Sequence, residues 1–391
     1  MTTSPISFSL GQRGERFLFF DAFIKGMGSP SSLLPEGGRL ILVSTYYPDV
    51  MFDFSEVEVT LDGLRLERFE EIGYNELEPS RAIIYPLTDV PPRGRHELVV
   101  RYRGESTTRS IAPDADPDRR RFAVATLFKD DFGNLETFYR YHKRQGFERF
   151  YFFYNGPLAN VRRHLPEADD IVYGEWDFAY WLDSTSVAFR SGLVDFQARR
   201  NTHHAQAAFL TLVRHRFLAD CSFLALIDLD EFLAVEQDTV RTFVERTDAI
   251  SLTARSHWTE VRRFEHLLPA AVWRMRDFRR LLSLSHRLRH LWQARVHAQV
   301  KARPLPLADL GRVWANVRSE GKERPKTIYR HDYPGNFRIH TPRVRGDIRY
   351  SEDLKLYHLI NAAHARYSRI HPDARPLSLL AGRPHEVSRS E

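Results

Sequence analysis

Short runs of β-branched and aromatic residues fill the first part of the chain. Polar, turn-forming pairs such as Asp62-Gly63 and Pro91-Pro92 separate them. Such runs predict strands, and they cover residues 41–47, 57–61, 81–87 and 96–102. Several short strands at this spacing favour a small antiparallel sandwich. We therefore predict a β-rich N-terminal domain over residues 1–115.

The pattern changes at Phe122, where apolar runs begin to alternate with segments of helical spacing. Continuous apolar runs are typical of strands that are covered on both faces. The predicted strands span residues 122–128, 149–156, 170–176 and 222–233, and the predicted helices span residues 135–146 and 204–220. This order predicts an α/β fold with a mostly parallel sheet, in a second domain over residues 120–391.

Residues 262–303 carry apolar stripes on a strongly basic background. We predict a basic helical insertion at about residues 262–320, with a membrane-surface helix as the alternative reading. The net charge of +6 is modest for 391 residues. The positive charge is not organised around a nucleic-acid-binding motif, so we expect no nucleic-acid partner.

A single cysteine, Cys221, rules out an internal disulfide. The N-terminus has no signal-peptide pattern, and the chain lacks the apolar run of about 18 residues that a membrane-spanning helix needs. We expect a cytoplasmic protein, with peripheral contact to the inner face of the membrane as an addition that the basic segment suggests.

Asp228 and Asp230 follow directly on the apolar run of the last predicted strand. Residues two apart on a strand point to the same side, so their carboxylates converge and repel each other. A divalent Mg²⁺ or Mn²⁺ relieves that repulsion and can hold a diphosphate. The alternatives are an acidic surface turn, or the metal site of a nucleotidyltransferase or phosphohydrolase. The sequence has no phosphate-binding loop of the GxxxxGK[ST] type, which weakens the case for a nucleotide hydrolase.

Four segments around this acidic pair share their order and spacing with a known family. The segment 125–156 contains Lys129, Asp130, Asp131, Glu136, His142, Gly146, Tyr154 and Asn155. Gln206 lies on the helix before the Asp-x-Asp-Glu-Phe motif, and later segments span residues 326–342 and 354–362. Together they resemble the family 92 and related family 2-like glycosyltransferases, well over residues 122–234 and loosely over 326–369.

The resemblance implies a GT-A (Rossmann-like) fold and an enzyme, a hexosyltransferase that uses Mn²⁺ or Mg²⁺. It implies a nucleotide-sugar donor, with a UDP-sugar favoured, a glycan or glycolipid acceptor, and a role in polysaccharide biosynthesis. Asp228 would lie near the ribose and the metal, and Asp230 would bind the metal. His340, with His358 as the alternative, would complete the coordination.

The remaining site residues are assigned by charge and position. Lys129, Asp131 and Lys326 are expected to contact the donor, with Lys326 neutralising its diphosphate. An inverting reaction, which the resemblance suggests, needs a carboxylate to deprotonate the acceptor hydroxyl. Glu260 and Asp332 are the candidates, and Glu231 is expected to bond the backbone or the acceptor. A sugar-binding relative without catalysis is a further alternative, because a fold does not guarantee activity.

Overall fold

We describe the fold from a computed structural model of the 391-residue chain. The residues described are 5–9, 16–26, 38–45, 54–67, 70–72, 80–87, 94–114, 121–129, 132–162, 164, 168–177, 204–236, 238–260, 325–338, 349–359 and 375–376.

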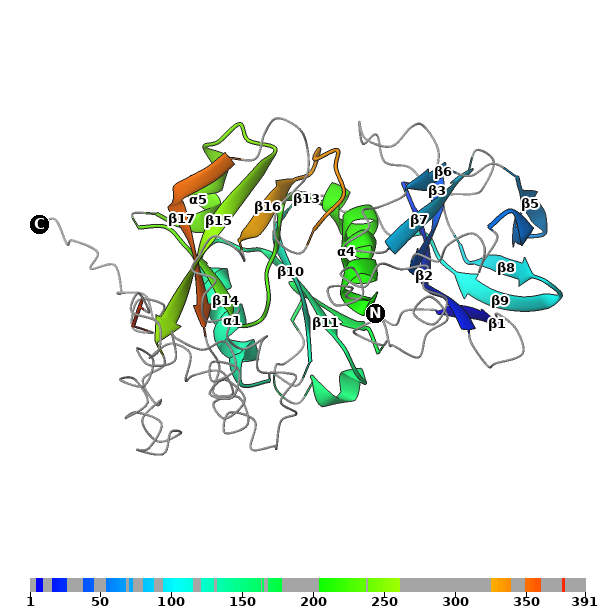
Figure 1. The fold of residues 1–391 in the computed structure, drawn as a ribbon, viewed down its shortest axis with the longest axis horizontal. Coiled ribbons are helices and arrows are strands. Elements are labelled where there is room, and N and C mark those ends of the chain that lie inside the picture. Colours follow the sequence, from blue (N-terminus) through cyan, green and yellow to red (C-terminus); the bar gives the residue numbers. More distant parts are fainter. Residues whose placement is uncertain are drawn as a thin grey trace, which may run out of the picture.

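Two antiparallel sheets, which we call the N-terminal sheets, form the first part of the molecule (Figure 1). The first has the strand order β1-β2-β3-β7-β6 and the second the order β5-β4-β8-β9. Their strands are β1 (Ile6–Ser9), β2 (Arg16–Lys25), β3 (Gly38–Thr45), β4 (Val57–Leu61), β5 (Leu64–Leu66), β6 (Glu70–Ile72), β7 (Ser80–Leu87), β8 (His96–Tyr102) and β9 (Glu105–Ile111), with a 3₁₀ turn η1 (Phe54–Glu56) before β4. Residues from both sheets, such as Phe19, Leu42 and Val100, share one buried core.

The predicted turn at Asp62-Gly63 joins β4 to β5. Both residues have positive φ angles, 51° and 80°, as a type I′ hairpin requires. Arg103 and Gly104 repeat this geometry between β8 and β9, with φ angles of 45° and 85°. The four strands predicted here are confirmed by β3, β4, β7 and β8. The domain boundary near residue 115 stays a prediction.

A nine-stranded mixed sheet forms the second part, with the order β12-β11-β10-β13-β16-β15-β17-β14 and β18 paired to β15. Its strands are β10 (Arg121–Phe128), β11 (Arg149–Tyr154), β12 (Ile171–Glu175), β13 (Cys221–Leu226), β14 (Glu231–Ala234), β15 (Ser251–Glu260), β16 (Lys326–Arg330), β17 (Arg349–Leu359) and β18 (Arg375–Pro376). Strands β12, β11, β10 and β13 are parallel, whereas β16 is antiparallel to both β13 and β15. The expected α/β fold with a mostly parallel sheet is confirmed for the described residues.

Helices cover both faces of the parallel strands. Helix α1 (Phe132–Arg144) packs on one face, where Phe138 meets Phe122 and Val124 of β10 in a common core. Helix α4 (His204–Phe217) packs on the other, with Ala123 of β10 in its core. The alternation along β10 explains its continuous apolar sequence, because each side chain is buried against one of the two helices. Shorter helical elements are η2 (Leu158–Asn160), η3 (Leu218–Asp220) and α5 (Val240–Glu245).

Helix α4 also packs against the N-terminal sheets, so it lies between them and the large sheet (Figure 1). Arg216 on this helix pairs with Asp21 at 2.7 Å and with Asp114 at 2.6 Å. After the helix, Asp220 pairs with Lys25 of β2 at 2.6 Å. Apolar packing and buried ion pairs therefore join the N-terminal sheets to the helix that supports the large sheet.

One expectation is corrected here, and another falls outside the described residues. The strand predicted over 222–233 is interrupted at residues 227–230, between β13 and β14. The basic insertion predicted at 262–320 lies outside the described residues. Within the described part of the chain, no helix has the length and apolar character to span a membrane.

Candidate functional site

The carboxyl ends of the parallel strands meet at one edge of the large sheet, which we call the ligand edge. Strand β10 ends before Lys129, β11 before Asn155, and β13 shortly before Asp228. Open α/β sheets bind ligands at this edge. Because β16 runs the opposite way and pairs Thr327 with Leu226, it brings Lys326 to the same edge.

An acidic turn connects β13 to β14 at this edge. The backbone N–H of Glu231 donates to the carbonyl of Asp228 at 3.0 Å. In return, the backbone N–H of Asp228 donates to Oε2 of Glu231 at 2.7 Å. Asp228 and Asp230 therefore belong to a turn rather than to a strand, and alternation along a strand does not set their direction. Glu231 is only 1% exposed, so it serves to close the turn.

Lys326 is the cation of this site. Its Nζ lies 2.7 Å from Oδ2 of Asp228 and 3.3 Å from Oε2 of Glu231. The lysine side chain is 4% exposed, whereas that of Asp228 is 40% exposed. Burial lowers the pKa of Lys326, but attraction and hydrogen bonding to the two carboxylates outweigh it and raise that pKa above its ordinary value. The site therefore combines a fixed positive charge with an accessible carboxylate.

A small pocket opens beside Asp228, between the large sheet and helix α4. Its volume is about 20 Å³, which is room for about one water molecule. The lining comes from β10, α4, the end of β13 and the start of β16: Ala125, Thr126, Leu127, Gln206, Phe209, Leu210, Leu226, Ile227, Asp228 and Lys326.

His142 contacts strand β14, which follows directly on the acidic turn. Its side chain is fully buried; Nδ1 donates to the carbonyl of Phe138 at 2.9 Å, and Nε2 accepts from the N–H of Leu233 at 3.4 Å. The ring also stacks on Phe232, with 5.6 Å between centroids. Burial lowers the pKa of His142 to about 3, so the ring is neutral and links helix α1 to β14.

Asn155 ties the strand ends together. Its backbone N–H donates to the carbonyl of Phe128 at 2.8 Å, and its side-chain amide donates to the carbonyl of Trp176 at 2.7 Å. Three adjacent strands, β10, β11 and β12, are thereby fixed at the ligand edge.

The structure describes only some of the other predicted site residues. Lys129 is exposed at the end of β10, and Glu136 forms a surface ion pair with Arg140 on helix α1. Asp131 and His340 lie outside the described residues. Glu260 is the last residue of β15 and thus lies toward the ligand edge.

The backbone register brings His358 to the acidic turn. Strand β17 pairs His358 with Glu231 on one side and with Trp258 on the other. Of the two histidines proposed as a metal ligand, His358 is the one whose backbone the structure describes. The family resemblance offered His358 as a residue of the site, but residue patterns alone do not reveal which strands pair, so this register could not be predicted.

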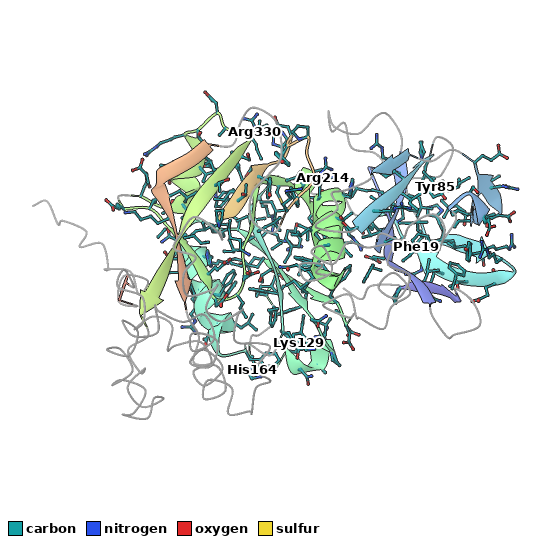
Figure 2. All side chains as sticks on the ribbon, viewed as in Figure 1. Phe19, Tyr85, Lys129, His164, Arg214 and Arg330 are labelled. Carbon is teal, nitrogen blue, oxygen red and sulfur yellow. The ribbon has the colours of Figure 1, made fainter. Side chains whose placement is uncertain are left out.

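Asp332 lies at the opposite edge of the sheet. Strand β16 begins at the ligand edge and ends with Arg330, whose Nε and Nη2 donate to the Asp332 carboxylate at 2.7 and 2.8 Å. Figure 2 shows Arg330 and Lys129 at opposite ends of the large sheet. The hydrogen bonds from Arg330 lower the pKa of Asp332, which also opposes a role as a base. Asp332 does not join the acidic turn, so its candidacy as the catalytic base is withdrawn.

The described residues contain no group of three or more His, Cys, Asp or Glu side chains arranged to hold a metal ion. The acidic turn carries two aspartates, Asp228 and Asp230. Gln206, which belongs to the segments that carry the family resemblance but was given no role at the site, is a further polar residue in the pocket.

A family model for glycosyltransferase family 92 matches residues 121–355. A comparison with curated proteins gave no match. The match begins at the first residue of β10 and ends within β17, so it includes the acidic turn and Lys326. The chain belongs to glycosyltransferase family 92, and it is a glycosyltransferase.

Proposed function

We propose that this protein transfers a hexose from a nucleotide-sugar donor, with a UDP-sugar favoured, to a glycan or glycolipid acceptor. We further propose a GT-A type site at the ligand edge, with Asp228 and Asp230 as its centre. The observation that carries the proposal is the acidic turn, in which the accessible carboxylate of Asp228 lies 2.7 Å from the buried Lys326.

The chemistry of the turn fits a divalent cation. Mg²⁺ is commonly held by one or two carboxylates and completes its shell with water and substrate phosphates, so two aspartates suffice for Mn²⁺ or Mg²⁺. A bound ion would neutralise charge on the leaving diphosphate. Asp228 and Asp230 are the proposed ligands, and His340 or His358 is the proposed imidazole ligand.

Lys326 supplies a positive charge that does not depend on a metal. Negative charge grows on the diphosphate as the glycosidic bond breaks, and a fixed cation near it stabilises the transition state. Lys326 is held in place by Asp228 and Glu231, so it needs no rearrangement to act. Lys129, exposed at the end of β10, is proposed as a second contact to the donor, together with Asp131.

An inverting mechanism requires a base for the acceptor hydroxyl. Glu231 is buried and bonded within the turn, so its role is structural. Of the carboxylates considered, Glu260 remains as the proposed base, since its strand ends toward the ligand edge.

The direct test is a transfer assay. Purified protein with Mn²⁺ is incubated with a panel of UDP- and GDP-sugars and a mixture of oligosaccharide and glycolipid acceptors, and released nucleotide is measured. The proposal predicts release of UDP that the Asp230→Asn variant loses. Release of pyrophosphate or of inorganic phosphate would instead identify a nucleotidyltransferase or a phosphohydrolase. Binding of sugars without any turnover would indicate a non-catalytic relative.

We also propose a cytoplasmic location with peripheral contact to an anionic membrane, supported by the basic composition of residues 262–303. Sedimentation with vesicles of anionic and of neutral lipid tests this. Co-sedimentation with anionic vesicles alone is expected, and a protein that never pellets would remove the membrane contact from the account.

A further inference from the structure

The side-chain amide of Gln206 is buried at the start of helix α4. Gln206 is the third residue of this helix and is 7% exposed. Its Oε1 atom has no hydrogen-bond partner among the described residues. A buried acceptor without a partner destabilises a protein, and such groups in a folded protein call for an explanation. One explanation is a ligand that donates a hydrogen bond to this oxygen.

The position of Gln206 connects it to the acidic turn. It lines the pocket of about 20 Å³ that Asp228 and Lys326 also line. Most of the remaining lining is apolar, with Phe209, Leu210 and Leu226 among it. The other polar side chain of the lining is Thr126, whose hydroxyl also has no hydrogen-bond partner among the described residues.

The polar atoms at the pocket determine which group fits. Carboxylate and amide oxygens accept hydrogen bonds, whereas the ammonium group of Lys326 donates them, and two of its three N–H groups already face Asp228 and Glu231. Because the atom without a partner is the carbonyl oxygen of Gln206, the group that satisfies it must donate a hydrogen bond, which a phosphate or carbonyl oxygen cannot do. The volume suits one hydroxyl.

We propose that Gln206 accepts a hydrogen bond from a ribose hydroxyl of the bound nucleotide, in the pocket that it shares with Asp228. This inference rests on the proposed function, because it takes the nucleotide-sugar donor to bind at the acidic turn. It adds a residue that selects ribonucleotides over their deoxy analogues.

The experiment compares nucleotides that differ by one hydroxyl. Binding of UDP, 2′-deoxy-UDP and 3′-deoxy-UDP is measured by calorimetry with Mn²⁺, on the unmodified protein and on Gln206→Met, which is similar in length but has no acceptor amide. The unmodified protein is expected to bind one of the deoxy analogues about tenfold more weakly than UDP, the size of one hydrogen bond to a buried group. Gln206→Met is expected to weaken UDP binding by a similar factor and to abolish the difference between UDP and that analogue.

A matched substitution separates this role from a structural one. The side-chain carbonyl of Gln145 accepts a hydrogen bond from the N–H of Val240 at 3.2 Å, so Gln145→Met should lower the melting temperature and leave nucleotide selectivity unchanged. Gln206→Met should lower it less than Gln145→Met does, because the carbonyl of Gln206 has no hydrogen-bond partner among the described residues to lose.

The outcomes are distinguishable. If the unmodified protein does not bind UDP with Mn²⁺, the proposed function fails first. If UDP binds but the three nucleotides bind equally, or Gln206→Met weakens all of them equally, the ribose contact is wrong while the donor site stands.

Discussion

Lys326 Nζ lies 2.7 Å from Oδ2 of Asp228, although 98 residues of chain separate the two. The antiparallel pairing of β16 with β13 produces this contact, because it starts β16 where β13 ends. A buried cation is thereby placed against an accessible carboxylate at the edge of the sheet where α/β proteins bind ligands.

Removing the Lys326 charge is expected to destabilise the protein strongly. In Lys326→Met, Glu231 would remain buried without its cation, and breaking a buried ion pair from one side costs about 3–5 kcal/mol. Urea unfolding measures this loss. The matched control is Lys355→Met on β17, whose partner Glu236 is 72% exposed, so a loss of at most about 1 kcal/mol is expected there. Equal losses of unfolding free energy in both variants would show that the buried ion pair of Lys326 stabilises the protein no more than the exposed pair does.

The ion pairs of Arg216 are expected to couple the N-terminal sheets to the rest of the protein. Asp21 is 2% exposed, so Arg216→Met removes the guanidinium charge from beside a buried carboxylate and should cost about 3 kcal/mol or more. Arg65→Met, which removes an exposed pair with Glu58, is the control and should cost less than about 1 kcal/mol. Calorimetric unfolding should show one transition shifted downward in Arg216→Met. Two separate transitions in the unmodified protein would contradict the coupling.

His142 is expected to make the protein sensitive to acid. Its folded pKa of about 3 lies below its ordinary value of 6.5, so the unfolded state binds the proton first. This contribution to stability is fully present above about pH 6.5 and is lost as the pH falls toward 3. The loss is at most about 1.4 kcal/mol per pH unit.

The measurement is urea unfolding between pH 4 and 7 on the unmodified protein and on His142→Gln. The variant should show a shallower dependence of unfolding free energy on pH. Some slope is expected to remain, because burial also lowers the pKa of His215 to about 3. Parallel curves for the two proteins would mean that His142 is not buried in its neutral form.

Two carboxylates that the sequence alone treats as equivalent bases are expected to behave differently. Glu260→Gln should lower the transfer rate by about 100-fold or more, as loss of a general base does. Asp332→Asn should leave it nearly unchanged, because Asp332 pairs with Arg330 at the opposite edge of the sheet. Rates of UDP release decide between them. A large loss in Asp332→Asn would overturn the placement of the active site.

The local elements could be predicted from the sequence, but their mutual arrangement could not. Strand β4 and the turn at Asp62-Gly63 follow from residue types, and helix α4 from its apolar spacing. Periodicity does not reveal that β16 runs antiparallel to β13. Because of this direction, Lys326 at the start of β16 lies at the ligand edge, whereas Asp332 after its end lies at the opposite edge. For the same reason, the pairing of His358 with Glu231 was not foreseen.

The acidic turn shows the limit within a single segment. The apolar sequence from Ser222 to Leu233 predicts one strand. Instead, strand β13 ends at Leu226, and a second strand, β14, begins at Glu231 and pairs with β17. The signal was present in Glu231, whose side chain bonds the backbone of Asp228 three residues earlier. Such a bond competes with a regular strand.

We expect the acidic turn to bind a nucleotide diphosphate through a metal ion. Calorimetric titration of UDP, and then GDP, into the purified protein with and without Mn²⁺ tests it, with Asp230→Ala as the matched variant. The account predicts metal-dependent binding of UDP that Asp230→Ala loses while its melting temperature is retained. Absence of binding to either nucleotide with any metal, or binding that survives in Asp230→Ala, would contradict it.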